Sequence, residues 1–233
     1  MTHAAHDQLP VYEARWFPAN TTVTPDAQRW AVALQGGSTL ELPLRALPSG
    51  DKAIALLMTN QTSFAVEDAL APLVTELAAS FAPNVIAAVP TMGLDYGRAV
   101  ARGLGHAHYV ALGHSRKFWY DERLSESTTS STSTKGKQVY LDPALVERVH
   151  GKRVVLVDDV INTGVSAVSA IRLLQRAGAE VVGMVTVLSE GHAWRAVVNE
   201  LGTGWEHRVK ALGHIPMFAS NDQGGWAPIP DTL

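Results

Sequence analysis

Residues 153 to 166 have the sequence Arg-Val-Val-Leu-Val-Asp-Asp-Val-Ile-Asn-Thr-Gly-Val-Ser. We expect the rest of the chain to form a scaffold that presents them. The apolar run 154–157 is typical of a strand covered on both faces by helices. Asp158 and Asp159 follow it, and a Thr-Gly-Val-Ser turn then leads into apolar residues at helical spacing, namely Val165, Val168, Ile171 and Leu174. Because an open parallel sheet binds ligands at the carboxyl ends of its strands, we expect both carboxylates to lie beside a helix N-terminus at the binding crevice.

The turn at residues 163–166 has the features of a phosphate site. Its backbone N–H groups and two hydroxyls can cradle one phosphate, and the helix dipole favours the negative charge. The two carboxylates would repel that phosphate, so the same ligand must offer them hydroxyl groups, with a divalent cation nearby. A ribose 5-phosphate meets this condition. A P-loop is excluded because no Lys follows Thr163-Gly164, and the glycine spacing of a dinucleotide fingerprint is missing.

The run Val-Val-Leu-Val-Asp-Asp-Val-Ile-Asn-Thr-Gly-Val-Ser resembles the phosphoribosyl pyrophosphate (PRPP) motif of the type I phosphoribosyltransferases. The resemblance implies an α/β fold, with an open, mostly parallel twisted sheet, helices on both faces and a small variable hood. It also implies transfer of the 5-phosphoribosyl group from PRPP to a nucleobase nitrogen, with release of pyrophosphate and with Mg²⁺ as cofactor. Asp158 and Asp159 would be catalytic and would hold Mg²⁺, mostly through PRPP and water. The ribose and 5-phosphate would contact Asp158, Asp159, Val160, Asn162, Thr163, Gly164, Val165 and Ser166.

Two further turns are candidates for pyrophosphate binding. The strand predicted at 85–89 is followed by Thr91, Met92, Gly93 and Leu94, which by resemblance form the pyrophosphate loop, often with a non-proline cis peptide bond. An ordinary strand-to-helix turn is the alternative. Beyond the strand predicted at 109–112, Arg116 and Lys117 are candidate catalytic residues that would grip pyrophosphate, or else they form a solvated charge pair.

Residues 115–140 are predicted to be the flexible loop of the family, which closes over PRPP and excludes water. The segment 125–134 is almost entirely Ser and Thr, and a long loop without structure is usually functional or disordered. Candidate pyrophosphate contacts are Tyr120, Ser127, Lys135 and Lys137. The alternative is a solvated tether.

The domain organisation follows from these assignments. Residues 1–50 are predicted to be N-terminal strands and possible hood, 51–212 the phosphoribosyltransferase core, and 213–233 a C-terminal tail and possible hood. Within the core we expect further strands at 54–58, 180–188 and 208–212. Phe218 and Trp226 could stack on a base, although packing against the sheet is the favoured interpretation for both.

Composition excludes several classes of function. The 233 residues, 46% of them hydrophobic, suffice for one sizeable domain. A net charge of −3 gives no electrostatic footprint for nucleic acid or an anionic membrane. Cysteine is absent, which excludes disulfides and thiolate metal sites. With neither a membrane-length apolar run nor a signal-peptide pattern, we expect a cytoplasmic protein, and the resemblance implies a homodimer.

The acceptor is predicted to be a purine, because the long loop and the Arg-Lys pair are closest to the adenine and xanthine branch of the family. Two departures weaken that inference. Asn162 stands where hypoxanthine-guanine enzymes usually have Asp, and an amide cannot act as a general base. Val165 stands where many members have Gly. The alternative is a non-catalytic PRPP-binding regulator, against which the loop and the missing DNA-binding domain argue. A response regulator would need an order of acid cluster, Thr/Ser strand and Lys strand that this chain lacks.

Overall fold

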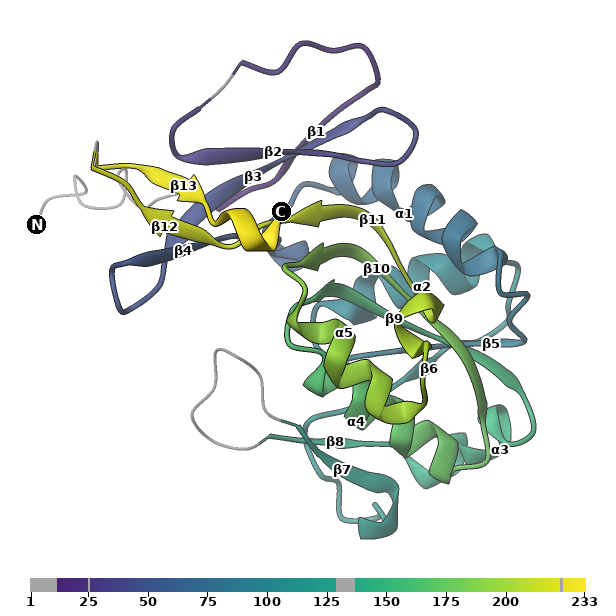
Figure 1. Cartoon of the computed structure of the whole chain (residues 1–233). Helices are drawn as coiled ribbons and strands as arrows, with labels where there is room; N and C mark the ends of the chain where they lie inside the picture. The colour runs from purple at the N-terminus through teal and green to yellow at the C-terminus, as the bar shows by residue number, and fades with distance from the viewer. Residues whose placement is uncertain (1–11, 25, 129–136, 223) are drawn as a thin grey trace, which may run out of the picture.

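The protein is described from a computed structural model that covers residues 12–24, 26–128, 137–222 and 224–233. Its centre is a sheet of five parallel strands, β5 (Val85–Ala88), β6 (Val110–Ala111), β9 (Arg153–Ile161), β10 (Glu180–Glu190) and β11 (Val209–Ile215) (Figure 1). The strand order is β11-β10-β9-β5-β6, so the strand that carries the paired acids is central. The predicted α/β fold class is confirmed.

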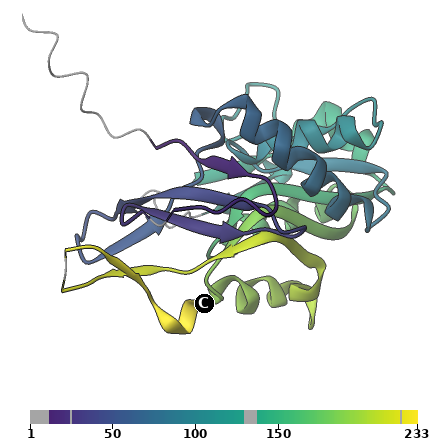
Figure 2. The same ribbon diagram turned by 90° about the horizontal axis from the view of Figure 1, so that it is seen from above.

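Helices cover both faces of this sheet, as Figure 2 shows. On one face lie α1 (Phe64–Ala79) and α2 (Gly93–Gly103), and on the other lie α3 (Val146–Val149), α4 (Val165–Arg176) and α5 (Ala193–Val198). Because both faces are covered, residues Val154 to Val157 of β9 are fully buried, which explains their uninterrupted apolar run. None of the helices in the described part of the chain combines the length and hydrophobicity that a membrane span requires.

A second, antiparallel sheet joins the two ends of the chain. Its strands are β1 (Arg15–Phe17), β2 (Arg29–Ala33), β3 (Thr39–Ala46), β4 (Lys52–Ala55), β12 (Phe218–Ser220) and β13 (Trp226–Pro228). The order is β1-β3-β4-β12-β13, with β2 paired to β3. The segments predicted as a possible hood therefore lie in one sheet.

The strand expected at 54–58 corresponds to β4 and lies in the second sheet, which corrects the prediction that it belongs to the core. Strand β4 covers Lys52–Ala55 and pairs with β3 and β12 of the second sheet, not with the parallel sheet. A turn explains this pairing: the N–H of Leu47 donates to the carbonyl oxygen of Lys52 at 2.8 Å, so β4 folds back directly onto β3. A short apolar run indicates a buried strand but does not select its partner.

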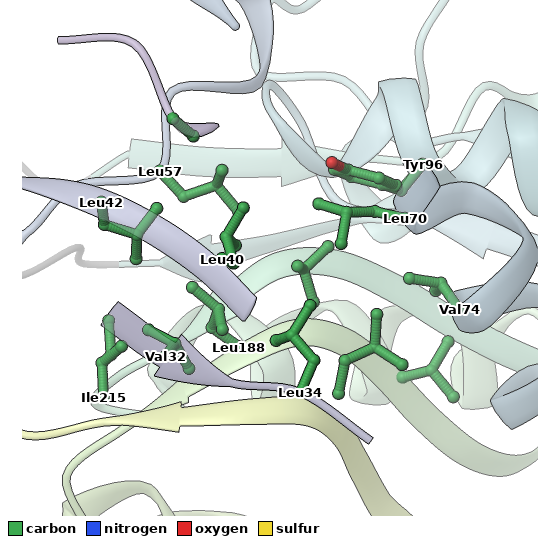
Figure 3. Packing of buried hydrophobic residues seen from close by; sticks show 14 of the residues in the cluster. Val32, Leu34, Leu40, Leu42, Leu57, Leu70, Val74, Tyr96, Leu188 and Ile215 are labelled. Atoms are coloured by element: carbon green, nitrogen blue, oxygen red, sulfur yellow. The ribbon is translucent and has the colours of Figure 1, made fainter. Parts of the chain in front are cut away.

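The two sheets share one hydrophobic core (Figure 3). Leu40 and Val32 of the second sheet pack beside Leu188 and Ile215, which come from the C-terminal ends of β10 and β11. Gly213 allows this close approach, because a Cβ there would lie 2.7 Å from Cγ1 of Val32. The shared core fixes the second sheet over the edge where the parallel strands end.

The loop expected to be without structure contains a small antiparallel sheet of β7 (Ser125–Thr128) and β8 (Lys137–Tyr140). Residues 129–136 between these strands, including the candidate Lys135, lie outside the described residues. Short 3-10 helices complete the described chain at Thr59–Gln61, Glu122–Leu124, Pro143–Leu145, Asn199–Leu201, Trp205–Arg208 and Pro230–Thr232.

Candidate active site

The turn between β9 and α4 has the geometry expected of an anion site. Gly164 is the N-cap of α4 and has a φ of +81°. A Cβ on Gly164 would lie 3.1 Å from the carbonyl oxygen of Trp194, so both backbone conformation and space require glycine. The first N–H groups of a helix have no acceptor within the helix, so those at the start of α4 can donate to a ligand. One of them, the N–H of Val165, also donates to the Thr163 hydroxyl at 3.4 Å. The local sequence thus builds a ready anion cradle.

Asp158 and Asp159 lie at the centre of the same edge. Asp158 is buried, and its Oδ1 accepts a hydrogen bond from the N–H of Asp159 at 3.0 Å. Burial, together with the charge of Asp159, raises the pKa of Asp158 well above its ordinary value, and burial also raises the pKa of Asp159. Ionising both carboxyl groups is therefore unfavourable, and a bound cation or hydroxyl donors would stabilise their negative charges.

The turn after β5 touches this pair. The peptide bond between Pro90 and Thr91 is cis, as the family resemblance leads us to expect. Helix α2 begins at Gly93, where a Cβ would lie 2.7 Å from Oδ1 of Asp158 and 2.8 Å from its Cα. A hydrogen bond of 2.7 Å from the Thr59 hydroxyl to Asp95 anchors the start of α2 from outside. The two turns are therefore packed against each other through Gly93.

Two adjoining cavities open at this edge. The smaller has a volume of about 110 Å³ and lies on the turn that leads into α4. The larger, of about 410 Å³, has an apolar side formed by residues 54–58 and a polar side that includes both aspartates. The two cavities share Asp158, Val160, Asn162 and Ser166. The polar lining of the larger one also includes Thr91, His114, Thr128 and Glu190.

Glu190 and Asn162 form a pair on the wall of the larger cavity. Neighbouring residues of their strands, Ser189 of β10 and Ile161 of β9, are paired in the sheet. The Asn162 amide Nδ2 donates a hydrogen bond to Oε2 of Glu190. Oε1 of Glu190 is buried and has no hydrogen-bond partner among the described residues. Burial raises the pKa of Glu190 from its usual 4.5 to about 7.

The sequence that forms these two turns and the acid pair matches a known family. The family model described as "Phosphoribosyl transferase domain" matches residues 55–211, which is more than half of the chain. The chain belongs to this phosphoribosyl transferase family. The match covers β5, β6, β9, β10, the first residues of β11 and both turns of the site, but not the strands β1 to β3 or β12 and β13.

Individual phosphoribosyltransferases resemble parts of the chain. Orotate phosphoribosyltransferase of Staphylococcus aureus is 35% identical over 105 residues, which are 44% of this chain and 45% of that protein. The chain thus matches less than half of the length of this curated relative. The structure of APRTase from Giardia lamblia complexed with 9-deazaadenine has a TM-score of 0.55 and 21% identity, covering 66% of this chain and 81% of that one. The structure of orotate phosphoribosyltransferase from Aeropyrum pernix has a TM-score of 0.52 and 20% identity, covering 74% of this chain and 85% of that one. These two likenesses concern the fold.

Most residues predicted from the PRPP motif of the family converge on the two cavities. The smaller one is lined by Asp158, Val160, Asn162, Thr163, Gly164 and Ser166. Asp159 lines only the larger one, together with Thr91 and Met92. Gly93 lies against Asp158 instead of lining a cavity. Neither cavity is lined by Val165 or Leu94.

Arg116, Lys117 and Tyr120 are not among the residues that line either cavity. Arg116 forms an ion pair of 2.5 Å with Glu122, and both side chains are more than half exposed. Lys117 is exposed, and the ring of Tyr120 packs at 5.8 Å from that of Tyr140. In this arrangement Arg116 and Tyr120 contact local partners, and the grip of these residues on pyrophosphate stays a prediction.

The Ser/Thr-rich segment is partly tied to the motif helix, which corrects the prediction of a structureless loop. The Ser169 hydroxyl donates to the carbonyl oxygen of Ser127 at 2.7 Å. The buried Thr128 donates to the Ser166 hydroxyl at 3.0 Å. These contacts, with Arg176 bonded to the carbonyl oxygen of Ser125, hold β7 against α4. Strand β7 therefore belongs to the wall of the site.

Phe218 and Trp226 do not reach the cavities. Phe218 is fully buried and meets the ring of Trp30 edge-to-face at 5.1 Å, so it has no face free for a base. Trp226 is partly buried against the same core. Packing, the favoured interpretation of both residues, agrees with this arrangement.

His114 and Glu190 are cavity residues that the sequence did not single out. The ring nitrogens of His114 lie 3.1 Å from the carbonyl oxygen of Pro90 and 2.9 Å from that of Gln138. His114 thus links the turn after β5 to β8. Their positions could have indicated them, because each residue follows a predicted strand and so lies at the carboxyl edge of the sheet.

Glu190 is expected to make stability depend on pH. Its pKa is higher in the folded protein than its usual 4.5, so its stabilising contribution is complete below about pH 4.5 and is lost as pH rises through about 7. The shift corresponds to at most about 3 kcal/mol. The free energy of unfolding of Glu190→Gln minus that of the wild type should therefore be larger at pH 8 than at pH 5, as measured by urea unfolding.

The matched control is Glu180→Gln, at the other end of β10, whose side chain is 66% exposed. It should show the pH dependence of the wild type. An unchanged pH dependence in Glu190→Gln would contradict the assigned burial of this carboxyl group.

Proposed function

We propose that this protein transfers the 5-phosphoribosyl group of PRPP to a ring nitrogen of a purine base and releases pyrophosphate, with Mg²⁺ as cofactor. The observation that carries the proposal is the pair formed by the buried Asp158 and the partly buried Asp159, between a small cavity on a helix N-terminus and a larger chamber. Membership of the phosphoribosyl transferase family supports it.

The 5-phosphate of PRPP fits the small cavity. Backbone N–H groups at the start of α4 and the hydroxyls of Thr163 and Ser166 would surround it. The 2- and 3-hydroxyls of the ribose would then donate to Asp158 and Asp159, which gives hydrogen-bond donors to two neighbouring carboxylates that otherwise repel each other. The ribose would thus be fixed at the boundary between the two cavities.

The pyrophosphate would lie toward the turn after β5, where Thr91 and Met92 line the larger cavity. Carboxylate oxygens are the donors that Mg²⁺ prefers, so Asp158 and Asp159 fit this ion. Within the described ranges no group of three or more His, Asp or Glu side chains forms a complete metal site, so most ligands would come from PRPP and water. Bound Mg²⁺ would neutralise charge that develops on the leaving pyrophosphate.

The acceptor would occupy the chamber between residues 54–58 and the polar wall. A purine suits it, because a flat neutral base can pack on the apolar side. Orotate is the competing acceptor, since orotate enzymes are among the relatives. However, orotate carries a carboxylate, and the described lining of this chamber contains three acidic residues and no Lys or Arg. Electrostatics therefore favours the neutral base.

The test is pyrophosphate release from PRPP and Mg²⁺ with adenine, guanine, hypoxanthine, xanthine, uracil and orotate, with PRPP binding measured in parallel. Release with a purine is the expected result. Release with orotate alone would overturn the choice of base. Binding without release for any base would favour the PRPP-binding regulator, and absence of PRPP binding would remove the proposal altogether.

A further inference from the structure

We propose that Glu190, oriented by Asn162, is the specificity-determining residue of the acceptor chamber and accepts a hydrogen bond from an N–H group of a neutral heterocyclic base. This inference rests on the proposed function and assigns its acceptor selection to one side chain. It also names the chemical class that the side chain selects: bases that present an N–H donor, in preference to bases that carry an acidic group.

The first argument is the incomplete hydrogen bonding of a buried carboxyl group. Glu190 is 5% exposed, and within the described chain its Oε1 has no partner. It takes part in no ion pair of the described residues with Lys, Arg or His. An unpartnered buried acceptor is costly, and native proteins rarely keep one without a purpose. A structural role in the core would be served better by an amide or an apolar residue.

The second argument is position. Glu190 lines the 410 Å³ chamber, together with the aspartates that would hold the ribose. The chamber also has the apolar segment 54–58 in its lining, against which a flat base could pack. A base attached to the ribose would therefore come within reach of Glu190. The terminal torsion of a glutamate is soft, so a small rotation can present either carboxyl oxygen to the chamber.

The third argument concerns which groups the pair can recognise. Asn162 donates to Oε2 of Glu190 and so holds the carboxyl group in place. The carboxyl group, when ionised, can only accept hydrogen bonds, so it favours ring or exocyclic N–H donors. It also repels a carboxylate on the ligand, as Asp158 and Asp159 do. Specificity would thus combine an attraction for one class with a repulsion of the other.

The test compares Glu190→Gln with the wild type and with Glu180→Gln as control. Adenine, hypoxanthine and orotate are titrated calorimetrically into protein that contains Mg²⁺ and ribose 5-phosphate, so that turnover is not needed. In Glu190→Gln we expect purine affinity to fall about 10- to 100-fold, the cost of losing a charged hydrogen bond. Affinity for ribose 5-phosphate should stay within twofold, which also shows that the variant is folded.

A second readout is the pH profile of purine affinity. In the wild type the affinity should rise between pH 6 and 8 as Glu190 ionises, and this rise should be smaller in Glu190→Gln. Asp158, Asp159 and His114 line the same chamber, and His192 follows on the chain, but all four are retained in both proteins. The difference between the two profiles therefore isolates Glu190.

Several outcomes would overturn the inference. These are unchanged purine affinity in Glu190→Gln, an equal loss of purine and ribose 5-phosphate affinity, and the absence of purine binding to the wild type. Failure of the proposed function gives a different result: purines would bind in a Glu190-dependent manner, yet no pyrophosphate would be released from PRPP.

Discussion

Asp158→Asn is expected to lower kcat/KM for PRPP by about 100- to 1000-fold. The amide cannot offer a charged acceptor to the ribose hydroxyls or bind Mg²⁺ as a carboxylate does. A hydrogen bond to a charged group contributes about 1.5–3 kcal/mol, and the loss of two such interactions near the lower end of this range, about 3–4 kcal/mol in all, gives this factor. Initial rates and Mg²⁺-dependent PRPP binding provide the measurement.

The free energy of unfolding distinguishes this loss of activity from misfolding. Asp158 is buried and its pKa is raised, so its ionised form is unfavourable in the folded protein. At pH 8 the free energy of unfolding of Asp158→Asn should therefore equal or exceed that of the wild type. Asp68→Asn, on the exposed side of α1, is the control and should change neither property. Unchanged PRPP affinity in Asp158→Asn would remove the assignment of the ribose site.

Gly93→Ala is expected to lower kcat/KM about 100-fold and the free energy of unfolding by about 1–3 kcal/mol. The new methyl group would lie 2.8 Å from Cα of Asp158 and 3.0 Å from the carbonyl oxygen of Val157. These are backbone atoms of the central strand and cannot move aside cheaply. The start of α2 must move instead, and it would carry Thr91 and Met92 away from the position proposed for the ribose.

Gly225→Ala is the matched control, because its nearest contact would be an ordinary 3.5 Å. Both variants are compared with the wild type by initial rates and by urea unfolding. Full activity in Gly93→Ala would show that the function of the turn after β5 does not depend on its contact with β9.

Local patterns of the sequence predicted the centre of the molecule well. The strand, turn and helix at residues 153–176 form as expected, because apolar periodicity and Gly164 determine them within a short segment. The turn after β5 was located for the same reason, and its cis peptide bond agrees with the family resemblance. Parallel strands then bring the two turns together at one edge, as the sheet topology requires.

Contacts between distant segments could not be predicted in the same way. Asn162 meets Glu190 only because the register of β9 and β10 places their ends side by side. Phe218 was available for stacking in the sequence, but pairing of β12 with β4 turns it into the core beside Trp30. Arg116 was assigned to pyrophosphate from its charge, its position beyond a strand and the family resemblance, and none of these indicated that Glu122 lies close enough to pair with it.

The pairing of β4 with β12 has a consequence for the order in which the site can form. Residues 54–58, which line one side of the larger cavity, begin within a strand whose second partner is formed by residues 218–220. The turn between β9 and α4 precedes that partner in the chain. During synthesis this turn therefore leaves the ribosome before the segment that completes the pairing of β4.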